Sequence, residues 1–285
     1  MEKDKEKLQI IENIKKSIEN KNYNAKVELH DHIVTDEERE NIILKYDGRK
    51  KKIKNKVKTI VARSITDSIT KYINSKTEIK GLENIKGIQT GAIVTSNHFS
   101  KVDNTIIRYL MQKVGKKRKF DIVVQDTNIF MPGYLGWLLK NNRTIPINRS
   151  HQYISTNFEP TLEKILKQKH YVLIYPEEEM WFNYKKPRSG KIGAYHYACK
   201  YNVPIIPCFV EMQNLDKIGK DGFYEQKYTL HVMAPLYPDT SLDFKAQKEE
   251  LRKRDYELKV VKYEEVYQKK LDYNFNIEND IAGWN

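Results

Sequence analysis

A regular alternation of short apolar runs and helical stretches, which begins at residue 78, constrains the fold of this chain most strongly. Such alternation is typical of an α/β domain, because each helix packs on the sheet that its neighbouring strands build. We therefore expect an α/β fold: a single domain with a central mixed, largely parallel sheet flanked by helices. The predicted strands are 93–95, 120–124, 144–147, 171–175, 203–210 and 228–234, and the predicted helices are 104–113, 134–140, 158–168 and 192–201.

The segments outside this alternation complete the domain organisation. Residues 1–55 are a charged N-terminal arm, in which Leu8, Ile11, Ile14 and Ile18 recur at helical spacing and predict a short amphipathic helix. Residues 56–77 are predicted to form an amphipathic basic helix, and residues 78–240 the main domain. Residues 241–285 are expected to form a closing helix and a tail that is loose from Asn274 onward.

The basic helix has three possible roles. Residues 45–58 carry eight lysines and arginines against one aspartate. The apolar residues that follow step by four along one helical face. This face either packs on the domain core or lies in a membrane surface with the lysines on anionic head groups. A nucleic-acid patch is the weakest alternative, because no aromatic or arginine-rich pattern accompanies the lysines, and we expect no nucleic-acid partner.

Composition restricts where the protein acts. The chain has 51 Lys and Arg against 38 Asp and Glu, a net charge of +13 that favours anionic partners such as a lipid surface. Cys199 and Cys208 form neither a disulfide framework nor a metal pattern. No apolar segment follows the N-terminus, and none reaches the roughly 18 residues of a membrane span. We expect a cytoplasmic protein held peripherally on the inner face of the cell membrane.

The stretch from Gly91 to Asp103 carries the first candidate chemistry. A buried strand runs into a polar turn with Asn97 and His98, and Asp103 follows five residues after the histidine. Histidine serves as a general base near neutral pH, and a carboxylate on its other ring nitrogen fixes the tautomer. His98 is the only histidine that the pattern places at a strand end beside a carboxylate. By itself this spacing is also that of a polar turn with a helix cap.

A second histidine cluster, His30-Asp31-His32, has the residue types of a metal site. No third ligand is evident, and surface histidines are common, so we predict no metal site.

Four short blocks now follow in order along the chain. They are NHFSKVD from Asn97 to Asp103, RTIPINR from Arg143 to Arg149, YPEEE from Tyr175 to Glu179, and VPIIPC from Val203 to Cys208. Together they resemble the PlsC-type lysophosphatidic-acid acyltransferases of the glycerolipid acyltransferase superfamily. That family has N-H-x4-D, an apolar strand ending in Arg, F-P-E-G-T-R-S, and V-P-I-I-P. The resemblance covers about residues 78–240, which are thereby identified as an acyltransferase domain.

The resemblance implies transfer of a fatty acyl group from acyl-CoA or acyl carrier protein to a hydroxyl of a lysophospholipid. These donors are co-substrates, and no cofactor is expected. His98 would be the general base and Asp103 the residue that orients it. The residues expected to contact substrate are Asn97, Ser100, Arg143, Arg149, Pro176, Glu177, Lys185 and Arg188.

The third block departs from the family pattern. Glu178 replaces the glycine, and Glu179-Met180 replaces Thr-Arg. The lost arginine would contact an anionic substrate. Lys185, Lys186 and Arg188 either supply the missing charge or form a solvated loop. Arg149 either holds the acceptor or forms a structural salt bridge, with Glu177 as a candidate partner.

Other interpretations stay open at this point. The apolar stretch 129–139 either lines an acyl channel, touches the membrane, or belongs to the core. A thioester or ester hydrolase would use the same His98–Asp103 pair, and a non-enzymatic basic protein that binds membrane or RNA would not use it at all. Neither a P-loop nor a dinucleotide fingerprint occurs, and no G-x-S-x-G supplies a protein nucleophile.

Overall fold

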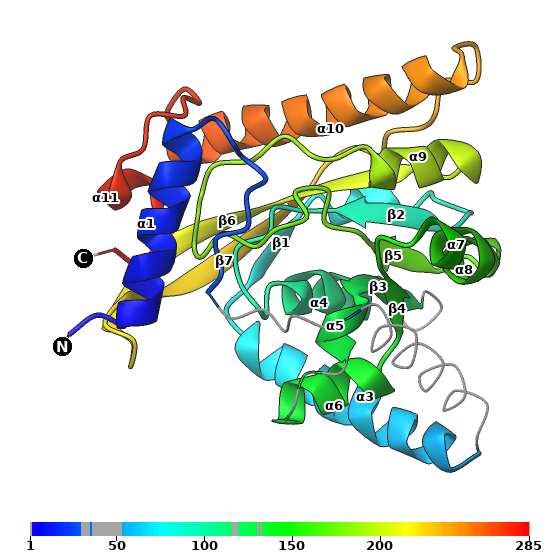
Figure 1. Ribbon diagram of the computed structural model, residues 1–285, viewed down its shortest axis with the longest axis horizontal. Coiled ribbons are helices and arrows are strands. Elements are labelled where there is room, and N and C mark those ends of the chain that lie inside the picture. The colour runs from blue at the N-terminus through cyan, green and yellow to red at the C-terminus, as the bar shows by residue number, and fades with distance from the viewer. Residues whose placement is uncertain are drawn as a thin grey trace.

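A seven-stranded mixed sheet forms the centre of the protein (Figure 1). The structure is a computed structural model that describes residues 2–29, 35, 53–115, 119–129, 131 and 133–284. The strand order is β1-β7-β6-β2-β5-β3-β4. The strands are β1 (Glu78–Lys80), β2 (Ala92–Thr95), β3 (Phe120–Gln125), β4 (Thr144–Ile147), β5 (Tyr171–Leu173), β6 (Ile205–Ile218) and β7 (Tyr224–Val232).

The expected α/β fold with a mixed, largely parallel sheet is confirmed. Strands β2 to β6 run in one direction, β7 is antiparallel to β6, and β1 is parallel to β7. All six predicted strands are present. The additional strand β1 has three residues, too few for an alternating pattern to show. Because β2, β3, β4 and β5 are parallel, the loops that follow them meet at one edge of the sheet, where open α/β sheets build their sites.

Successive side chains along the strands pack alternately into two hydrophobic cores, one on each face of the sheet. Ala92 and Val94 of β2 join the core under α4 (Asn104–Val114), whereas Ile93 between them joins the core under α8 (Glu159–Lys167) and α9 (Gly193–Lys200). Strand β5 alternates in the same way. Figure 1 shows α4 on one side of the sheet and α9 and α10 (Phe244–Tyr267) on the other.

The remaining helices are short or peripheral. On the α4 side lie α5 (Asp126–Ile129) and α6 (Gly133–Asn141). A 3-10 turn, η1 (Leu82–Ile85), follows β1. Helix α7 (His151–Tyr153) and a π-helical turn, η2 (Ile154–Phe158), lead into α8.

The N-terminal arm packs against the C-terminal end of the chain. Helix α1 (Lys5–Glu19) buries its predicted apolar face in a third core, together with Trp181, Phe223 and Ile281. The short helix α11 (Ile277–Asp280) precedes Ile281, whose side chain is fully buried. The expectation of a loose tail from Asn274 is therefore wrong: the tail has an apolar partner in the arm, which the sequence pattern does not reveal.

Helix α3 (Ile53–Ile73) occupies the place of the predicted amphipathic helix and packs on α4 and α6. Ala62 and Thr70 of this helix are buried, and Ile65 and Ile69 of the predicted apolar face are half-buried. By contrast, Val57, Ile60 and Val61 are 61%, 65% and 45% exposed. The alternative in which the apolar face packs on the core is thus wrong for these residues. Most of the basic segment 45–58 lies outside the described residues.

Within the described part of the chain, no helix is both long enough and apolar enough to cross a bilayer.

Candidate active site

His98 and Asp103 lie in the turn between β2 and α4, at the carboxyl edge of the sheet. The Asp103 carboxylate does not cap helix α4, although the residue stands at the N-cap position. Instead its Oδ2 accepts from the His98 ring at Nδ1 over 2.8 Å. The same oxygen accepts the backbone N–H groups of Phe99, at 2.8 Å, and Ser100, at 3.1 Å. The spacing of five residues therefore closes a tight loop around one carboxylate oxygen.

This arrangement fixes the histidine tautomer. An ionised carboxylate can only accept, so the ring nitrogen that faces Asp103 carries a proton and Nε2 keeps its lone pair. The His98 side chain is 20% exposed, whereas that of Asp103 is 2% exposed. The histidine side chain thus keeps access to solvent while its carboxylate partner is shielded from water.

The structure contains two further pairs of this kind, which the sequence pattern did not place. His170 Nδ1 lies 2.6 Å from Asp121, and His231 Nε2 lies 2.8 Å from Glu211. Their histidine side chains are 4% and 5% exposed. The expectation that His98 alone sits beside a carboxylate is therefore wrong. Among the described histidines in such pairs, His98 is nevertheless the one with access to solvent.

Tyr175 completes the surroundings of the pair. Its ring stacks on the His98 imidazole, with 4.0 Å between centroids and 13° between planes. Its hydroxyl donates to Asp103 Oδ1 over 2.6 Å. Burial, followed by the nearby Asp103 charge, raises the pKa of Tyr175 well above its ordinary value. The phenol therefore stays a donor at neutral pH.

Glu177 and Arg188 form a buried ion pair beneath this turn, with 2.8 Å between Oε2 and Nη2. Glu177 also accepts the backbone N–H groups of His98, at 3.2 Å, and Arg188, at 3.0 Å. Arg188 in turn donates to the carbonyl oxygens of Glu179 and His98. Burial lowers the pKa of Arg188, and the Glu177 charge opposes that shift. Both side chains contact each other and the backbone of His98, so the prediction that Glu177 and Arg188 contact substrate is wrong.

The two lysines of the KKPR run also have partners within the protein. Lys186 contacts Asp280 at 2.8 Å with a fully buried side chain. Lys185 lies over the Tyr267 ring of α10, at 5.7 Å from Nζ to the centroid. Burial lowers the pKa of Lys185. The solvated-loop interpretation is therefore wrong, and Lys185 faces the C-terminal part of the chain instead of the expected substrate.

Two other predicted contacts have structural roles. The buried Asn97 amide bridges to β6, donating to the Val210 carbonyl at 3.1 Å and accepting its N–H at 2.8 Å. Pro176 is buried, and its carbonyl accepts the N–H of Lys191 at 2.7 Å. These two residues hold the turn and the third block in place. Ser100 is half-buried beside Asp103 and remains near the surface.

Arg143 and Arg149 lie at opposite ends of β4 and hence at opposite edges of the sheet. Arg143 is close to Arg63 and Asp121, at the edge away from His98, so its prediction as a substrate contact is wrong for a substrate bound at His98. Arg149 is exposed at the same edge as His98. Two strands separate β2 from β4, which places Arg149 about 14 Å to the side. Glu177 pairs with Arg188, so the suggested Arg149–Glu177 salt bridge is absent from the described structure.

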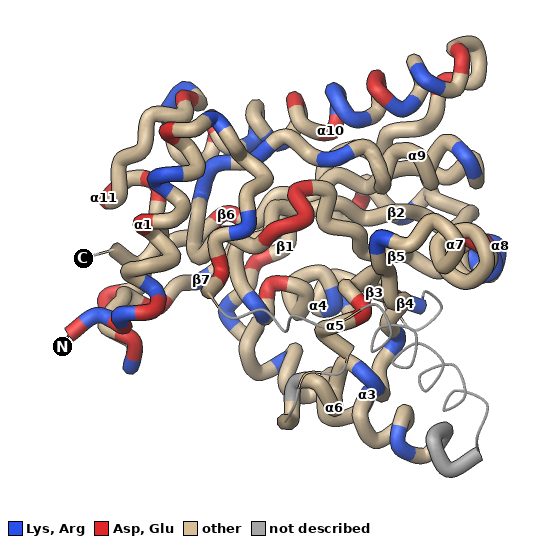
Figure 2. Tube along the Cα trace, viewed as in Figure 1, with Lys and Arg blue, Asp and Glu red and all other residues tan. Residues whose placement is uncertain are grey.

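In the third block, Glu178 adopts a backbone conformation that is typical of glycine. Glu178 has a φ of 61°, in the left-handed region that side chains other than glycine rarely adopt. Figure 2 shows Glu177, Glu178 and Glu179 as a continuous acidic segment near the centre of the molecule. The block therefore retains its turn but carries negative charge where the family pattern has Gly-Thr-Arg.

Hydrogen bonds from the N-terminal arm hold the third block in place, a contact that the sequence pattern does not predict. Asn24 donates to the carbonyls of Glu177, at 3.3 Å, and Ser189, at 3.0 Å. Trp181 Nε1 donates to the Ala25 carbonyl at 2.8 Å. Residues 23–25 have no motif, so only the fold reveals this contact.

The stretch 129–139 divides between core and surface. Ile129 is fully buried, whereas Tyr134 is 56% exposed and stacks near Trp137, with 6.1 Å between ring centroids. Phe130 lies outside the described residues. The stretch is thus neither wholly core nor wholly exposed.

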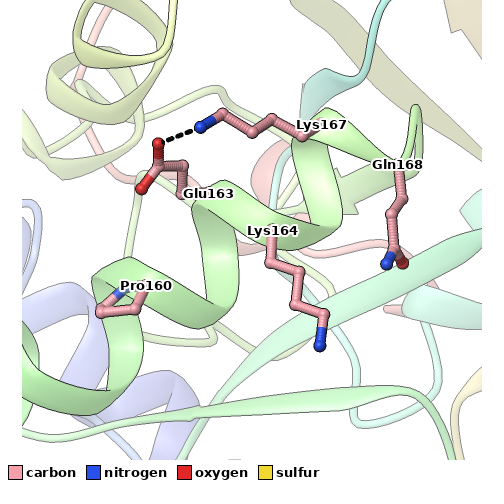
Figure 3. Close-up of a pocket in the computed structure, with 5 residues that line it drawn as sticks. All are labelled: Pro160, Glu163, Lys164, Lys167 and Gln168. Atoms are coloured by element: carbon pink, nitrogen blue, oxygen red, sulfur yellow. Dashed lines mark hydrogen bonds and ion pairs between the residues drawn. The ribbon is translucent and has the colours of Figure 1, made fainter.

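A further surface carries no catalytic groups. A shallow hollow on the outside of α8 is lined by Pro160 and four polar or charged side chains, with Glu163 and Lys167 paired at 2.6 Å (Figure 3). None of its residues belongs to the His98 site.

No group of three or more His, Cys, Asp or Glu side chains suited to a metal occurs in the part of the chain that the structure describes, and His30-Asp31-His32 lies outside that part.

Comparison with known proteins agrees with this geometry. The model of a family described as Acyltransferase matches residues 76–211, which include His98, Asp103 and the third block. Residues 76–211 of this chain are therefore similar to the acyltransferase family.

Two curated plant proteins have sequences similar to this chain. One is the chloroplastic 1-acyl-sn-glycerol-3-phosphate acyltransferase BAT2 of Brassica napus, 29% identical over 157 residues, which are 54% of this chain and 42% of that protein. The other is the chloroplastic LPAT1 of Arabidopsis thaliana, also 29% identical over 157 residues, 54% of this chain and 41% of that protein. The match thus spans less than half the length of either relative.

A solved structure shares the fold of this chain. The 1-acyl-sn-glycerophosphate acyltransferase PlsC from Thermotoga maritima superposes with a TM-score of 0.52 at 20% sequence identity. The superposition covers 81% of this chain and 89% of that chain.

Proposed function

We propose that the protein is an O-acyltransferase of phospholipid biosynthesis. It moves a fatty acyl group from acyl-CoA or acyl carrier protein to a free hydroxyl of lysophosphatidic acid or a related lysophospholipid. The match of residues 76–211 to the acyltransferase family model and the names of the plant relatives support this assignment. The observation that carries it is the His98–Asp103 pair, in which Nε2 is left as an accessible base.

His98 activates the acceptor in this proposal. An alcohol is a weak nucleophile until a base takes its proton during attack. As the acceptor oxygen forms a bond to the thioester carbonyl carbon, its proton passes to His98 Nε2. The tetrahedral intermediate then expels the thiolate, breaking the C–S bond, and the imidazolium returns the proton to that sulfur. The products are the acylated lipid and the free thiol of the donor.

Asp103 stabilises the imidazolium that forms in the first step. Its carboxylate holds the Nδ1 proton and is itself fixed by two backbone N–H groups and the Tyr175 hydroxyl. A preorganised carboxylate of this kind needs no rearrangement when charge develops on the ring. The step uses neither a protein nucleophile nor a cofactor, so the proposal includes no acyl-enzyme.

Arg149 is the cation proposed to hold the acceptor phosphate. It is exposed at the carboxyl edge of the sheet, whereas Arg188 is buried and neutralised by Glu177. The lateral distance between His98 and Arg149 is within the reach of a long arginine side chain plus a glycerophosphate. The acceptor would then lie across the ends of β5 and β3.

A membrane surface is the proposed source of the lipid. Val57, Ile60 and Val61 of α3 are exposed, and the exposed Tyr134 lies on α6, which packs beside α3. Apolar side chains at such positions insert into the interface between head groups and acyl chains, and nearby lysines favour anionic lipid. We propose peripheral attachment to the inner face of the cell membrane, with the protein otherwise in the cytoplasm.

The test is acyl transfer by the purified protein. A labelled acyl-CoA or acyl carrier protein thioester is incubated with a panel of lysophospholipids, and the products are separated. We expect an acylated product with wild type and a loss of about 10²–10⁴-fold with His98→Ala at an unchanged melting temperature. The matched control is His196→Ala, which changes a half-exposed histidine of α9.

Other outcomes contradict the proposal. Thioester loss without an acylated product would show a hydrolase that uses the same pair. Normal turnover by folded His98→Ala would refute the mechanism. Salt-sensitive binding to lipid or RNA without any reaction would favour the non-enzymatic alternative.

A further inference from the structure

The Asp103 carboxylate is held from two sides. Oδ2 receives the His98 ring and the two backbone N–H groups of the turn. Oδ1 receives the Tyr175 hydroxyl over 2.6 Å, the one donor that the described residues show for this oxygen. Rotation of the carboxylate about its Cβ–Cγ bond would break both sets of contacts. The tyrosine hydroxyl therefore locks the orientation in which Oδ2 faces the imidazole.

The same tyrosine also fixes the histidine ring. Its aromatic face lies 4.0 Å from the imidazole and almost parallel to it. The tyrosine therefore contacts both members of the pair, one through its ring and one through its hydroxyl. A phenylalanine at this position would keep the first contact and lose the second.

The other two histidine–carboxylate pairs lack this third member. Neither Asp121 nor Glu211 receives a tyrosine hydroxyl among the described contacts, and both pairs are buried. Among the three described histidine–carboxylate pairs, a tyrosine hydroxyl therefore accompanies only the one whose histidine reaches solvent.

We propose that Tyr175 is a positioning residue of the active site, which acts through Asp103 to hold His98 in its reactive tautomer and orientation. This inference rests on the proposed acyl transfer. In this proposal Tyr175 neither takes a proton nor forms a bond itself, and it acts through the His98–Asp103 pair. Its contribution is expected in the rate of the chemical step and not in the binding of the acceptor.

The first experiment compares Tyr175→Phe with Tyr228→Phe in the acyl-transfer assay. Tyr228 lies near Asp103, whose charge adds to burial in raising the pKa of Tyr228 to about 12, but its hydroxyl makes no hydrogen bond in the described structure. A hydrogen bond to a charged group contributes enough free energy for a loss of about tenfold or more in kcat. We expect that loss in Tyr175→Phe, with unchanged KM for the acceptor, and no loss in Tyr228→Phe.

A double-mutant cycle separates positioning from a merely structural role. If the hydroxyl acts through the carboxylate, Tyr175→Phe causes no further loss when Asp103→Asn is already present. Losses that multiply in the double variant would overturn the proposal, as would wild-type kcat in Tyr175→Phe. A raised acceptor KM with unchanged kcat would also overturn it, because the hydroxyl would then act in binding.

A spectroscopic measurement keeps this test independent of the proposed function. The proton on His98 Nδ1 gives a downfield NMR resonance, assigned by its loss in His98→Gln. We expect this resonance to shift in Tyr175→Phe and to stay in place in Tyr228→Phe. If wild type transfers no acyl group, the proposed function fails, and the NMR result alone decides: a shift supports the positioning contact and an unchanged resonance overturns it.

Discussion

The carboxylate of Glu177 and the guanidinium of Arg188 meet at 2.8 Å, in full burial, beneath the backbone of His98. Charge in such a place is stable only as a pair, because an isolated buried ion loses its hydration without compensation. The pair joins two ends of a loop eleven residues apart and holds the amide of the candidate base. Its role is to support the site from below.

We expect that either Glu177→Gln or Arg188→Met lowers the free energy of unfolding by about 3–5 kcal/mol, since each leaves one buried charge unpaired. The double variant should be less destabilised than the sum of the two losses. Urea unfolding of the three variants measures this coupling. Strictly additive losses would show that the two side chains do not depend on each other.

Glu178 allows a test of backbone strain in the third block. At its φ of 61°, a residue with a Cβ atom is disfavoured by about 1–2 kcal/mol relative to glycine. Both Glu178→Gly and Glu178→Ala remove the carboxylate, so the difference between them isolates the backbone term. We expect the glycine variant to be the more stable by about 1 kcal/mol in thermal or urea unfolding. Equal stabilities would mean that the turn relaxes when the side chain changes.

The sheet and the His98–Asp103 pair follow from local patterns, and these were the predictable parts. Strand and helix periodicity, and the return of a chain turn over five residues, involve only neighbouring residues. Arg188 could not be assigned from the sequence, because its partner depends on how the loop after β5 folds back. The same holds for Asn24, whose contact joins the arm to a loop more than 150 residues away.

Arg143 shows a different limit of prediction from the sequence. Both arginines of the second block border the same short strand, and a motif does not tell which end of that strand faces the site. Only the parallel pairing of β2, β5, β3 and β4 places Arg149 at the His98 edge and Arg143 at the other.

Arg149→Ala is expected to weaken the use of an anionic acceptor. Losing a hydrogen bond from a charged group corresponds to roughly a tenfold or greater rise in acceptor KM. The kcat and the KM for the thioester should change little. Arg254→Ala, at an exposed position on α10, is the matched control. A lower melting temperature with unchanged acceptor kinetics would instead assign Arg149 a structural role.

The exposed apolar side of α3 predicts how the protein meets lipid. Ile60 is 65% exposed, and burying an isoleucine side chain in an apolar layer stabilises by about 1.5–3 kcal/mol. We expect Ile60→Glu to weaken co-sedimentation with vesicles rich in anionic phospholipid by at least about tenfold, through loss of that burial and added repulsion. Val261→Glu is the control, because Val261 is 60% exposed on α10, on the opposite side of the sheet. If both variants bind as wild type does, or if both lose binding equally, α3 is not the surface that contacts the membrane.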